Sequence, residues 1–294
     1  MEGLPVREVF VSGVRLMKEE FRNGRAMQEF RVRMSGRPRP LPHGRWTLTE
    51  RWNDLLIAHW AVSPAAVAGL LPECLQADIF DGAAWLGITP FWMDRIRVRG
   101  FPTLPGLNML PVLNLRTYVR DQRNGVPGVY VFSIDTGNLF AVLMGRMGQH
   151  LPCHWADVQI QYNDEREVSF FSRRRLALNP AVFQARNRGL GPTRKTAENR
   201  SGSLEFFLME RNTLYTSTRS GQVLRSNLHS VSWPLEMAEA EIEQNTLGDR
   251  LGLHLPEQPT SLHYLRRMAL YIWPAERVRA RVAAQPVRVA VTPS

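Results

Sequence analysis

The sequence predicts an α+β fold built on a large antiparallel sheet that closes, or nearly closes, into a barrel. Pairs of apolar, alternating segments flank turn dipeptides that favour hairpins, at Asp81-Gly82, Asn124-Gly125 and Ser220-Gly221. Only a few short segments between these strands have the apolar spacing of helices. Because consecutive hairpins pair antiparallel, we expect a β-barrel with a few flanking helices.

In the first half of the chain, two helices interrupt the strands. Ser63 and Pro64 begin one helix, since serine caps free amides and proline suits the first helical position. The helix after Gly137 is apolar on nearly all sides, which predicts that it is buried. The strands expected in this half lie at residues 49–60, 75–80, 83–89, 91–99, 113–120 and 129–136.

The second half of the chain repeats this pattern. A short apolar helix begins at Ser203, and the acidic segment 238–245 is predicted to be another helix. No internal repeat and no second linker divides the chain, so one large domain is expected. The strands expected here lie at residues 155–162, 168–175, 182–188, 214–218, 223–230 and 270–273.

Residues 1–45 differ in charge from the rest of the chain. They contain ten Arg or Lys against five Glu, and their end, RPRPLP, favours an extended linker. We expect residues 1–45 to form a loosely packed basic extension, residues 46–280 a barrel domain and residues 281–294 a tail. A basic arm for an anionic surface is the alternative interpretation of the extension.

Composition decides little about partners. The net charge of +10 is compatible with nucleic acid, but 35 of the 37 basic residues are arginine, which a GC-rich coding sequence explains equally well. Two cysteines are too few for a disulfide framework, so we expect a cytoplasmic location. No apolar run is long enough for a bilayer-spanning helix, so no membrane partner is predicted.

Several separate blocks of the sequence resemble one family in type and in order. They are RWNDLLIAHW at 51–60, DIFDGAAWLGITPF at 78–91, LNLRTYVR at 113–120, GVYVFSID at 128–135 and SLEFFLMER at 203–211. Together they resemble the YqjF-like uncharacterised proteins, a branch of the acetoacetate decarboxylase-like superfamily. The resemblance implies a cone-shaped antiparallel β-barrel around a buried central cavity.

The same resemblance argues against the chemistry of acetoacetate decarboxylase, which uses a cavity lysine as a Schiff-base nucleophile. The segment that precedes this lysine resembles residues 145–152, and Cys153 stands in the lysine's place. The two lysines of the chain, Lys18 and Lys195, lie in the extension and in a predicted surface loop. The resemblance also implies a glutamate at the position where this chain has Val112. Decarboxylation through a lysine Schiff base is therefore excluded.

Arg116 is the first candidate for a ligand contact. Its strand is apolar on both sides, where a charge is costly unless it is paired or faces a polar cavity. A guanidinium in the cavity suits a carboxylate, while the alternative is a structural ion pair with Glu210 or Asp135. The other cavity candidates are Arg146, Cys153, His154, Glu210, His229, Trp233 and His59.

The histidines and one cysteine are also candidates for catalytic or metal-binding groups. His150, Cys153 and His154 have a spacing that one helical turn could use for a metal, but Pro152 opposes a regular helix there. We therefore predict no metal and no cofactor. His59 and His229 suit a general base near neutral pH, or equally a buried structural role.

The sequence thus predicts a barrel protein that binds a small anionic or polar organic ligand, a carboxylate being the form that Arg116 favours, with acid–base chemistry left open. The alternative is a non-enzymatic module for nucleic acid or protein that uses the basic arm. The sequence assigns neither the ligand, nor a reaction, nor the oligomeric state.

Overall fold

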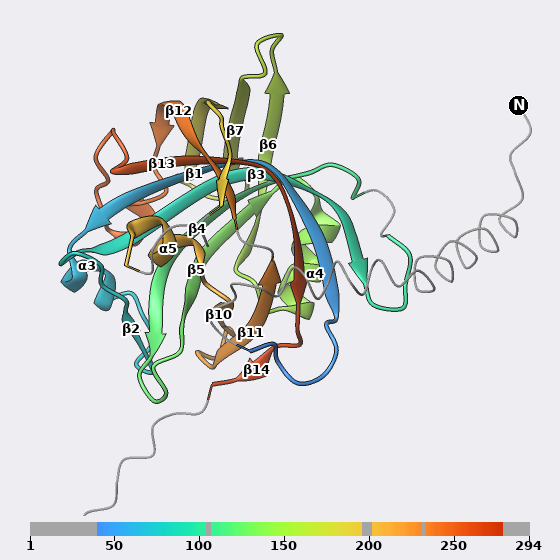
Figure 1. Cartoon of the computed structure of the whole chain (residues 1–294), viewed down its shortest axis with the longest axis vertical. Coiled ribbons are helices and arrows are strands. Elements are labelled where there is room, and N and C mark those ends of the chain that lie inside the picture. Colours follow the sequence, from blue (N-terminus) through green and yellow to red (C-terminus); the bar gives the residue numbers. More distant parts are fainter. Residues whose placement is uncertain (1–39, 104–106, 196–201, 231–232, 279–294) are drawn as a thin grey trace, which may run out of the picture.

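The computed structural model describes residues 40–103, 107–195, 202–230 and 233–278. Long strands dominate, and the helices are short (Figure 1). The elements are β1 (Leu48–Val62), α3 (Pro64–Ala68), β2 (Leu75–Ala77), β3 (Ala84–Val98), β4 (Leu110–Asp121), β5 (Pro127–Thr136), α4 (Leu139–Gly148), β6 (Cys153–Tyr162), β7 (Val168–Arg174), β8 (Val182–Gly189), β9 (Arg194–Lys195), α5 (Leu204–Met209), β10 (Thr213–Ser217), β11 (Val223–Ser230), β12 (Pro234–Asn245), η2 (Asp249–Leu251), β13 (Ser261–Ile272) and β14 (Glu276–Arg277).

Nine of the described strands close into a barrel. Hydrogen-bonded neighbours run β5-β6-β7-β8-β12-β13-β1-β3-β4, and the pairing of β4 with β5 completes the ring. The predicted closed sheet with few helices is therefore confirmed. Most pairs are antiparallel, but β5 pairs in parallel with both β6 and β10. The parallel β5–β6 pair requires a crossover, which α4 supplies.

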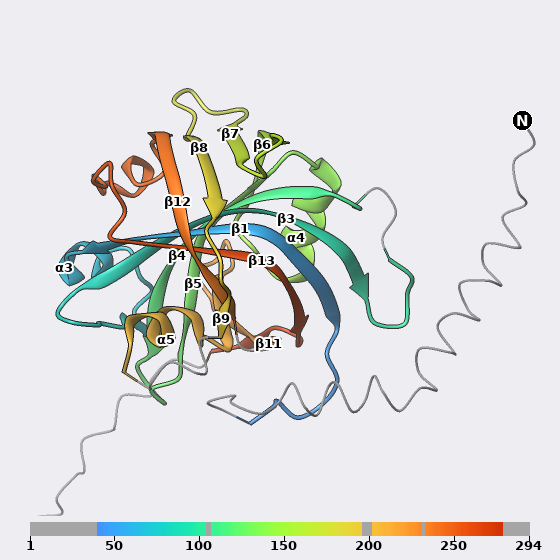
Figure 2. The same cartoon turned by 45° about the horizontal axis from the view of Figure 1, so that its top comes forward.

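A second, smaller circuit shares part of this barrel. Strands β10 and β11 bridge from β5 to β13, so β1, β3, β4, β5 and β13 belong to both rings. Figure 2 shows β11 near the lower end of the molecule and β6, β7, β8 and β12 at the upper end, with β13 crossing between them. The shared strands are covered on both faces. This explains why their sequences are apolar almost throughout.

Strand β1 shows how the two faces are divided. Leu55 and Ile57 pack into one buried cluster, whereas Leu56, Ala58 and Trp60 pack into another. Between its two halves the pairing of β1 with β3 shifts register near Asp54, whose φ is 50°. A bulge of this kind bends the strand, so its first half curves away to form the wall of a cavity.

Two of the three predicted hairpins are confirmed. Asn124-Gly125 joins β4 to β5, and Ser220-Gly221 joins β10 to β11. At Asp81-Gly82 the chain does turn tightly, with φ of 51° and 74°, but β2 pairs with β4 rather than with β3. Moreover, β3 is one continuous strand through Pro90. A turn dipeptide specifies a local reversal, while the choice of partner strand depends on distant packing.

The predicted acidic helix at 238–245 is wrong, because this segment is the second half of strand β12. Its residues alternate: Ala238, Ala240 and Ile242 pack against a buried cluster, and the glutamates between them face outward. These glutamates form ion pairs with β8, including Arg186 with Glu241 at 2.8 Å. A period of two is the strand signature, which the high helix propensity of Ala and Glu concealed.

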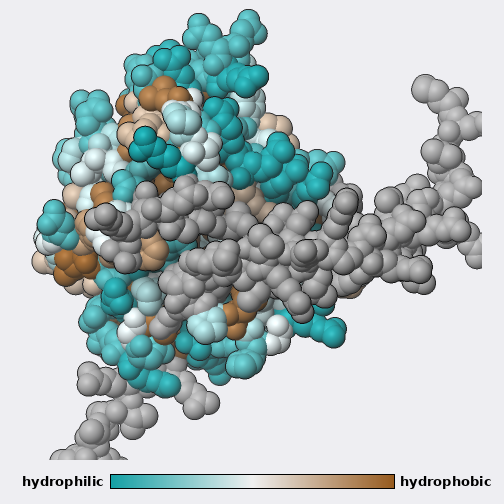
Figure 3. Space-filling model, in the orientation of Figure 1, coloured by the Kyte–Doolittle hydropathy of each residue, from teal (hydrophilic) through white to brown (hydrophobic). Residues whose placement is uncertain are grey.

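The expected burial of the helix after Gly137 is also wrong. Only Val142 of α4 is buried, and exposure of its large apolar residues reaches 66% at Met147. The helix forms one wall of a cavity and leaves its outer face exposed. On the side of the molecule that Figure 3 shows, the side chains along the visible edges are mostly hydrophilic.

Parts of the predicted domain plan lie outside the described residues. These are residues 1–39 of the basic extension and the whole tail at 281–294. Among the residues that are described, no helix is long and apolar enough to cross a membrane.

Candidate functional site

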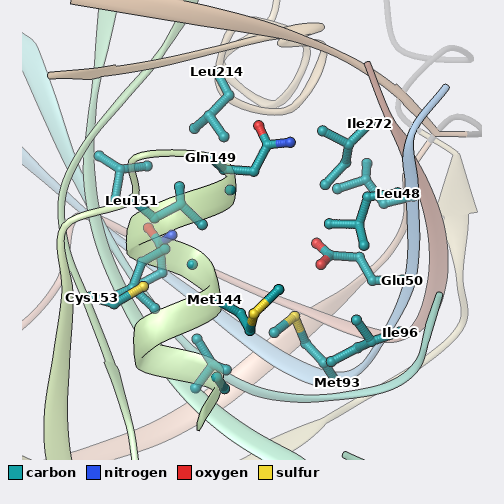
Figure 4. Close-up of a pocket in the computed structure, with 18 of the residues that line it drawn as sticks. Leu48, Glu50, Met93, Ile96, Met144, Gln149, Leu151, Cys153, Leu214 and Ile272 are labelled. Carbon is teal, nitrogen blue, oxygen red and sulfur yellow. The ribbon is translucent and has the colours of Figure 1, made fainter. Parts of the chain in front are cut away.

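A cavity of about 670 Å³ occupies the smaller circuit. Helix α4 forms one side, and the inward faces of β1, β3, β4, β5, β10, β11 and β13 form the rest. In Figure 4, Met144 of α4 and Gln149, the residue that follows the helix, lie opposite Leu48, Glu50 and Ile272. Most of the lining is apolar, so each polar side chain that faces the cavity needs its own explanation.

Helix α4 is held against β6 by the segment that resembles the superfamily motif. A Cβ atom on Gly145 would lie 2.7 Å from the Cys153 sulfur, so the helix packs this closely only because residue 145 is glycine. Arg146 donates from Nε and Nη2 to the carbonyl oxygen of Cys153, at 2.9 and 2.6 Å. Arg146 therefore fixes the cavity wall and does not line the cavity.

Cys153 lines the cavity. Burial raises the pKa of its thiol to about 12, although the nearby Arg146 charge opposes this. At neutral pH the sulfur is therefore a protonated, apolar wall group and a poor nucleophile. No lysine lines the cavity among the described residues. Lys195 belongs to β9, which pairs with β12.

Arg116 lines the cavity and is only 5% exposed. Its Nε has no hydrogen-bond partner, and no carboxylate of the described residues forms an ion pair with it. Asp135, one expected partner, instead accepts from Nε of Arg174 at 2.9 Å. Arg211, another buried arginine, pairs with Asp78 at 2.5 Å. Of these three buried guanidinium groups, the one at the cavity is therefore left unpaired.

Two more polar side chains lie on the same wall as Arg116. Asn114 is two residues from Arg116 on β4, and Thr136 on β5 lies farther along, opposite Val112 and two residues beyond the partner of Asn114. The Asn114 Oδ1 and the Thr136 Oγ1 are buried and have no hydrogen-bond partner. We call Asn114, Arg116 and Thr136 the polar floor. Sequence reasoning missed Asn114, although its spacing from Arg116 places both side chains on one face.

His59 lies next to Arg116 but does not line the cavity. Its Nε2 is 2.6 Å from the Tyr118 hydroxyl, and its Nδ1 has no partner. Burial, the charge of Arg116 and the neighbouring His263 lower the pKa of His59 well below its usual value. The imidazole is therefore neutral, and of these two neighbours only Arg116 carries a charge.

Glu50 is a second polar feature that sequence reasoning missed. Among the described residues it is the one carboxylate that lines the cavity, and it accepts a hydrogen bond from Trp52 Nε1 at 2.7 Å. Burial raises its pKa to about 7, against the effect of that hydrogen bond. The sequence did contain a signal for it: Glu50 lies two residues before Trp52, which places both side chains on one face of the strand. Val112 lines the cavity as an apolar residue.

The remaining predicted residues lie outside the cavity lining. His154 is half-buried on β6, and burial and nearby arginines lower its pKa to about 4. Glu210 caps α5, His229 lies beside Tyr271 with ring centres 6.4 Å apart, and Trp233 packs on Trp52. No group of three or more metal-binding side chains occurs in the described part of the chain.

Known proteins are similar to this chain in sequence. The profile of the DUF2071 family, described as an uncharacterized conserved protein, matches residues 49–269. The uncharacterized protein YqjF of Bacillus subtilis (strain 168) is 37% identical over 237 residues, which are 81% of this chain and 95% of YqjF.

Solved structures share the fold at low sequence identity. Acetoacetate decarboxylase of Legionella pneumophila has a TM-score of 0.56 at 11% identity, covering 86% of this chain and 96% of its own. The enduracididine biosynthesis enzyme MppR, solved with pyruvate, has a TM-score of 0.53 at 10% identity, covering 80% and 91%. The chain therefore belongs to the DUF2071 family of uncharacterized conserved proteins and has the acetoacetate decarboxylase-like fold.

Proposed function

We propose that this protein binds a small organic carboxylate in the barrel cavity, with Arg116 as its ionic partner. The observation that carries the proposal is the unpaired guanidinium, 5% exposed, at the wall of an apolar cavity. A buried charge without a counter-ion is costly, and a bound carboxylate offsets that cost with charge-assisted hydrogen bonds.

Two further features support this choice of ligand. The polar floor offers the amide of Asn114 two residues from the guanidinium and the hydroxyl of Thr136 farther along the same wall, so an oxygen-rich ligand finds several partners. In addition, the similarly folded MppR has been solved with pyruvate, a small carboxylate.

Acid–base chemistry on this ligand would use Glu50. Its pKa of about 7 lets it both take up and release a proton near neutral pH, and it faces the cavity. Neither Cys153 nor a lysine supplies a nucleophile there. The proposed function is thus ligand binding, with proton transfer by Glu50 as the reaction that the cavity favours.

The test is a thermal-shift and calorimetric screen of carboxylates and keto acids on the wild type and on Arg116→Leu. We expect ligands at a hundredfold excess over Kd to stabilise the wild type by about 2.7 kcal/mol and to leave Arg116→Leu unshifted. Arg173→Leu, an exposed change of the same charge on β7, is the matched control and should behave as wild type. Equal stabilisation of wild type and Arg116→Leu would refute the proposal.

A further inference from the structure

We propose that the ligand is an amphipathic carboxylic acid with a long apolar body, on the order of ten carbons, whose head group contacts Arg116 and whose body lies along the apolar lining. This inference rests on the proposed function and adds the class of ligand. It follows from the size of the cavity and from the chemistry of its lining.

The cavity is too large for a short keto acid. Its volume of about 670 Å³ lies within the range of roughly 300–1,000 Å³ that accommodates drug-sized ligands. A three- or four-carbon acid bound at Arg116 would leave most of the apolar wall in contact with water or with nothing. Either state loses the contacts that a longer ligand would make.

Beyond the polar floor the lining has few polar side chains. Two of them already have partners: Glu50 accepts from Trp52, and Gln149 accepts from Ser226. Most of the remaining wall is apolar, and it includes Met93, Leu110, Ile134, Leu214 and Leu270. A polar group of the ligand beside these apolar residues would lose its water without gaining a partner, so an alkyl or aryl body fits best.

The opening of the cavity is marked by the lining residues that are also exposed. They are Met144, Gly148 and His150 near the end of α4, and Pro274 and Arg277 after β13. A ligand therefore enters between α4 and the segment after β13. Figure 4 shows Met93 and Met144 close to each other in this passage. Methionine side chains are flexible and adapt to apolar chains of different shape.

The experiment measures Kd by calorimetry for butanoate, hexanoate, octanoate, decanoate and dodecanoate, below their aggregation concentrations, with 1-decanol as the neutral analogue. Each added methylene should lower Kd about fourfold until the cavity is filled. Decanoate should bind much more tightly than 1-decanol, and Arg116→Leu should remove that difference. Met144→Trp narrows the passage and should move the plateau to shorter acids, whereas Met147→Trp, on the exposed face of the same helix, should not.

The outcomes separate this inference from the proposed function. If all acids bind equally and Arg116→Leu abolishes binding, the proposed function holds and the long apolar body is refuted. If no acid binds at any length, both are refuted. If Met144→Trp and Met147→Trp give the same chain-length profile as wild type, the acids bind outside the cavity, which also overturns the inference.

Discussion

His59 on β1 and Arg116 on β4 lie side by side over Gly87 of β3. A Cβ atom on Gly87 would be 3.3 Å from the imidazole Cδ2 and 3.4 Å from the arginine Cγ. The three residues are register partners across neighbouring strands. The imidazole hydrogen-bonds Tyr118, and because a histidine is either neutral or cationic it cannot neutralise the charge of its neighbour. The charge of Arg116 is thus left for the cavity to neutralise.

Replacing Arg116 by leucine should leave the stability of the ligand-free protein unchanged or raise it. The substitution removes an unpaired buried charge and keeps an apolar side chain in the wall. Arg174→Leu is the contrasting variant, because it leaves the buried Asp135 carboxylate without its ion-pair partner. It should lower the free energy of unfolding by about 3–5 kcal/mol. Urea unfolding of both variants measures the difference. An equal loss in both would make Arg116 a structural residue.

Glu50→Gln should be more stable than the wild type at alkaline pH. Burial raises the folded-state pKa of Glu50 from 4.5 to about 7, so between these values the folded protein binds more protons than the unfolded chain. Wild-type stability therefore falls as pH rises through this window, by at most about 1.4 kcal/mol for each pH unit. The glutamine variant lacks this loss.

Unfolding free energies of wild type and Glu50→Gln, measured from about pH 4 to about pH 8, test this expectation. The two curves should lie closest below pH 4.5, where the wild-type carboxyl is protonated in both states. Glu257→Gln, an exposed change of the same charge, is the control and should follow the wild type. A constant offset between wild type and Glu50→Gln would contradict the assigned titration.

Gly145→Ala should destabilise the protein by about 1–3 kcal/mol, because the new methyl group would overlap the sulfur of Cys153. In a Cys153→Ala background the sulfur is absent. Gly145→Ala should then change the free energy of unfolding only slightly, because nothing at the site overlaps the new methyl group. A double-mutant cycle by chemical denaturation measures this coupling. Additive costs would mean that the helix and β6 do not meet at this contact.

Substitutions on α4 should separate its two faces. Val142→Ala removes buried methyl groups and should cost about 1–2 kcal/mol. Phe140→Ser, at a position 51% exposed, should change stability by less than about 0.5 kcal/mol. Thermal denaturation of the two variants tests this ordering, and a large loss for Phe140→Ser would indicate that the outer face of α4 is covered in solution.

Some properties of this protein depend on the sequence alone, because they rest on local preferences or on which side chains exist. Asn124-Gly125 makes a tight turn whatever surrounds it, and the apolar strand around Arg116 marks a charge that needs a partner. The absence of a lysine at position 153 excludes Schiff-base chemistry there without any coordinates.

Tertiary structure decided the rest, because pairing and exposure depend on residues that are distant in the chain. It placed β2 beside β4, turned the segment 238–245 into a strand opposite β8, and left one face of α4 exposed. It also brought Glu50 into the cavity and paired Asp135 with Arg174 rather than with Arg116. No local pattern reports these outcomes, since each is set by which surfaces the closed sheet brings together.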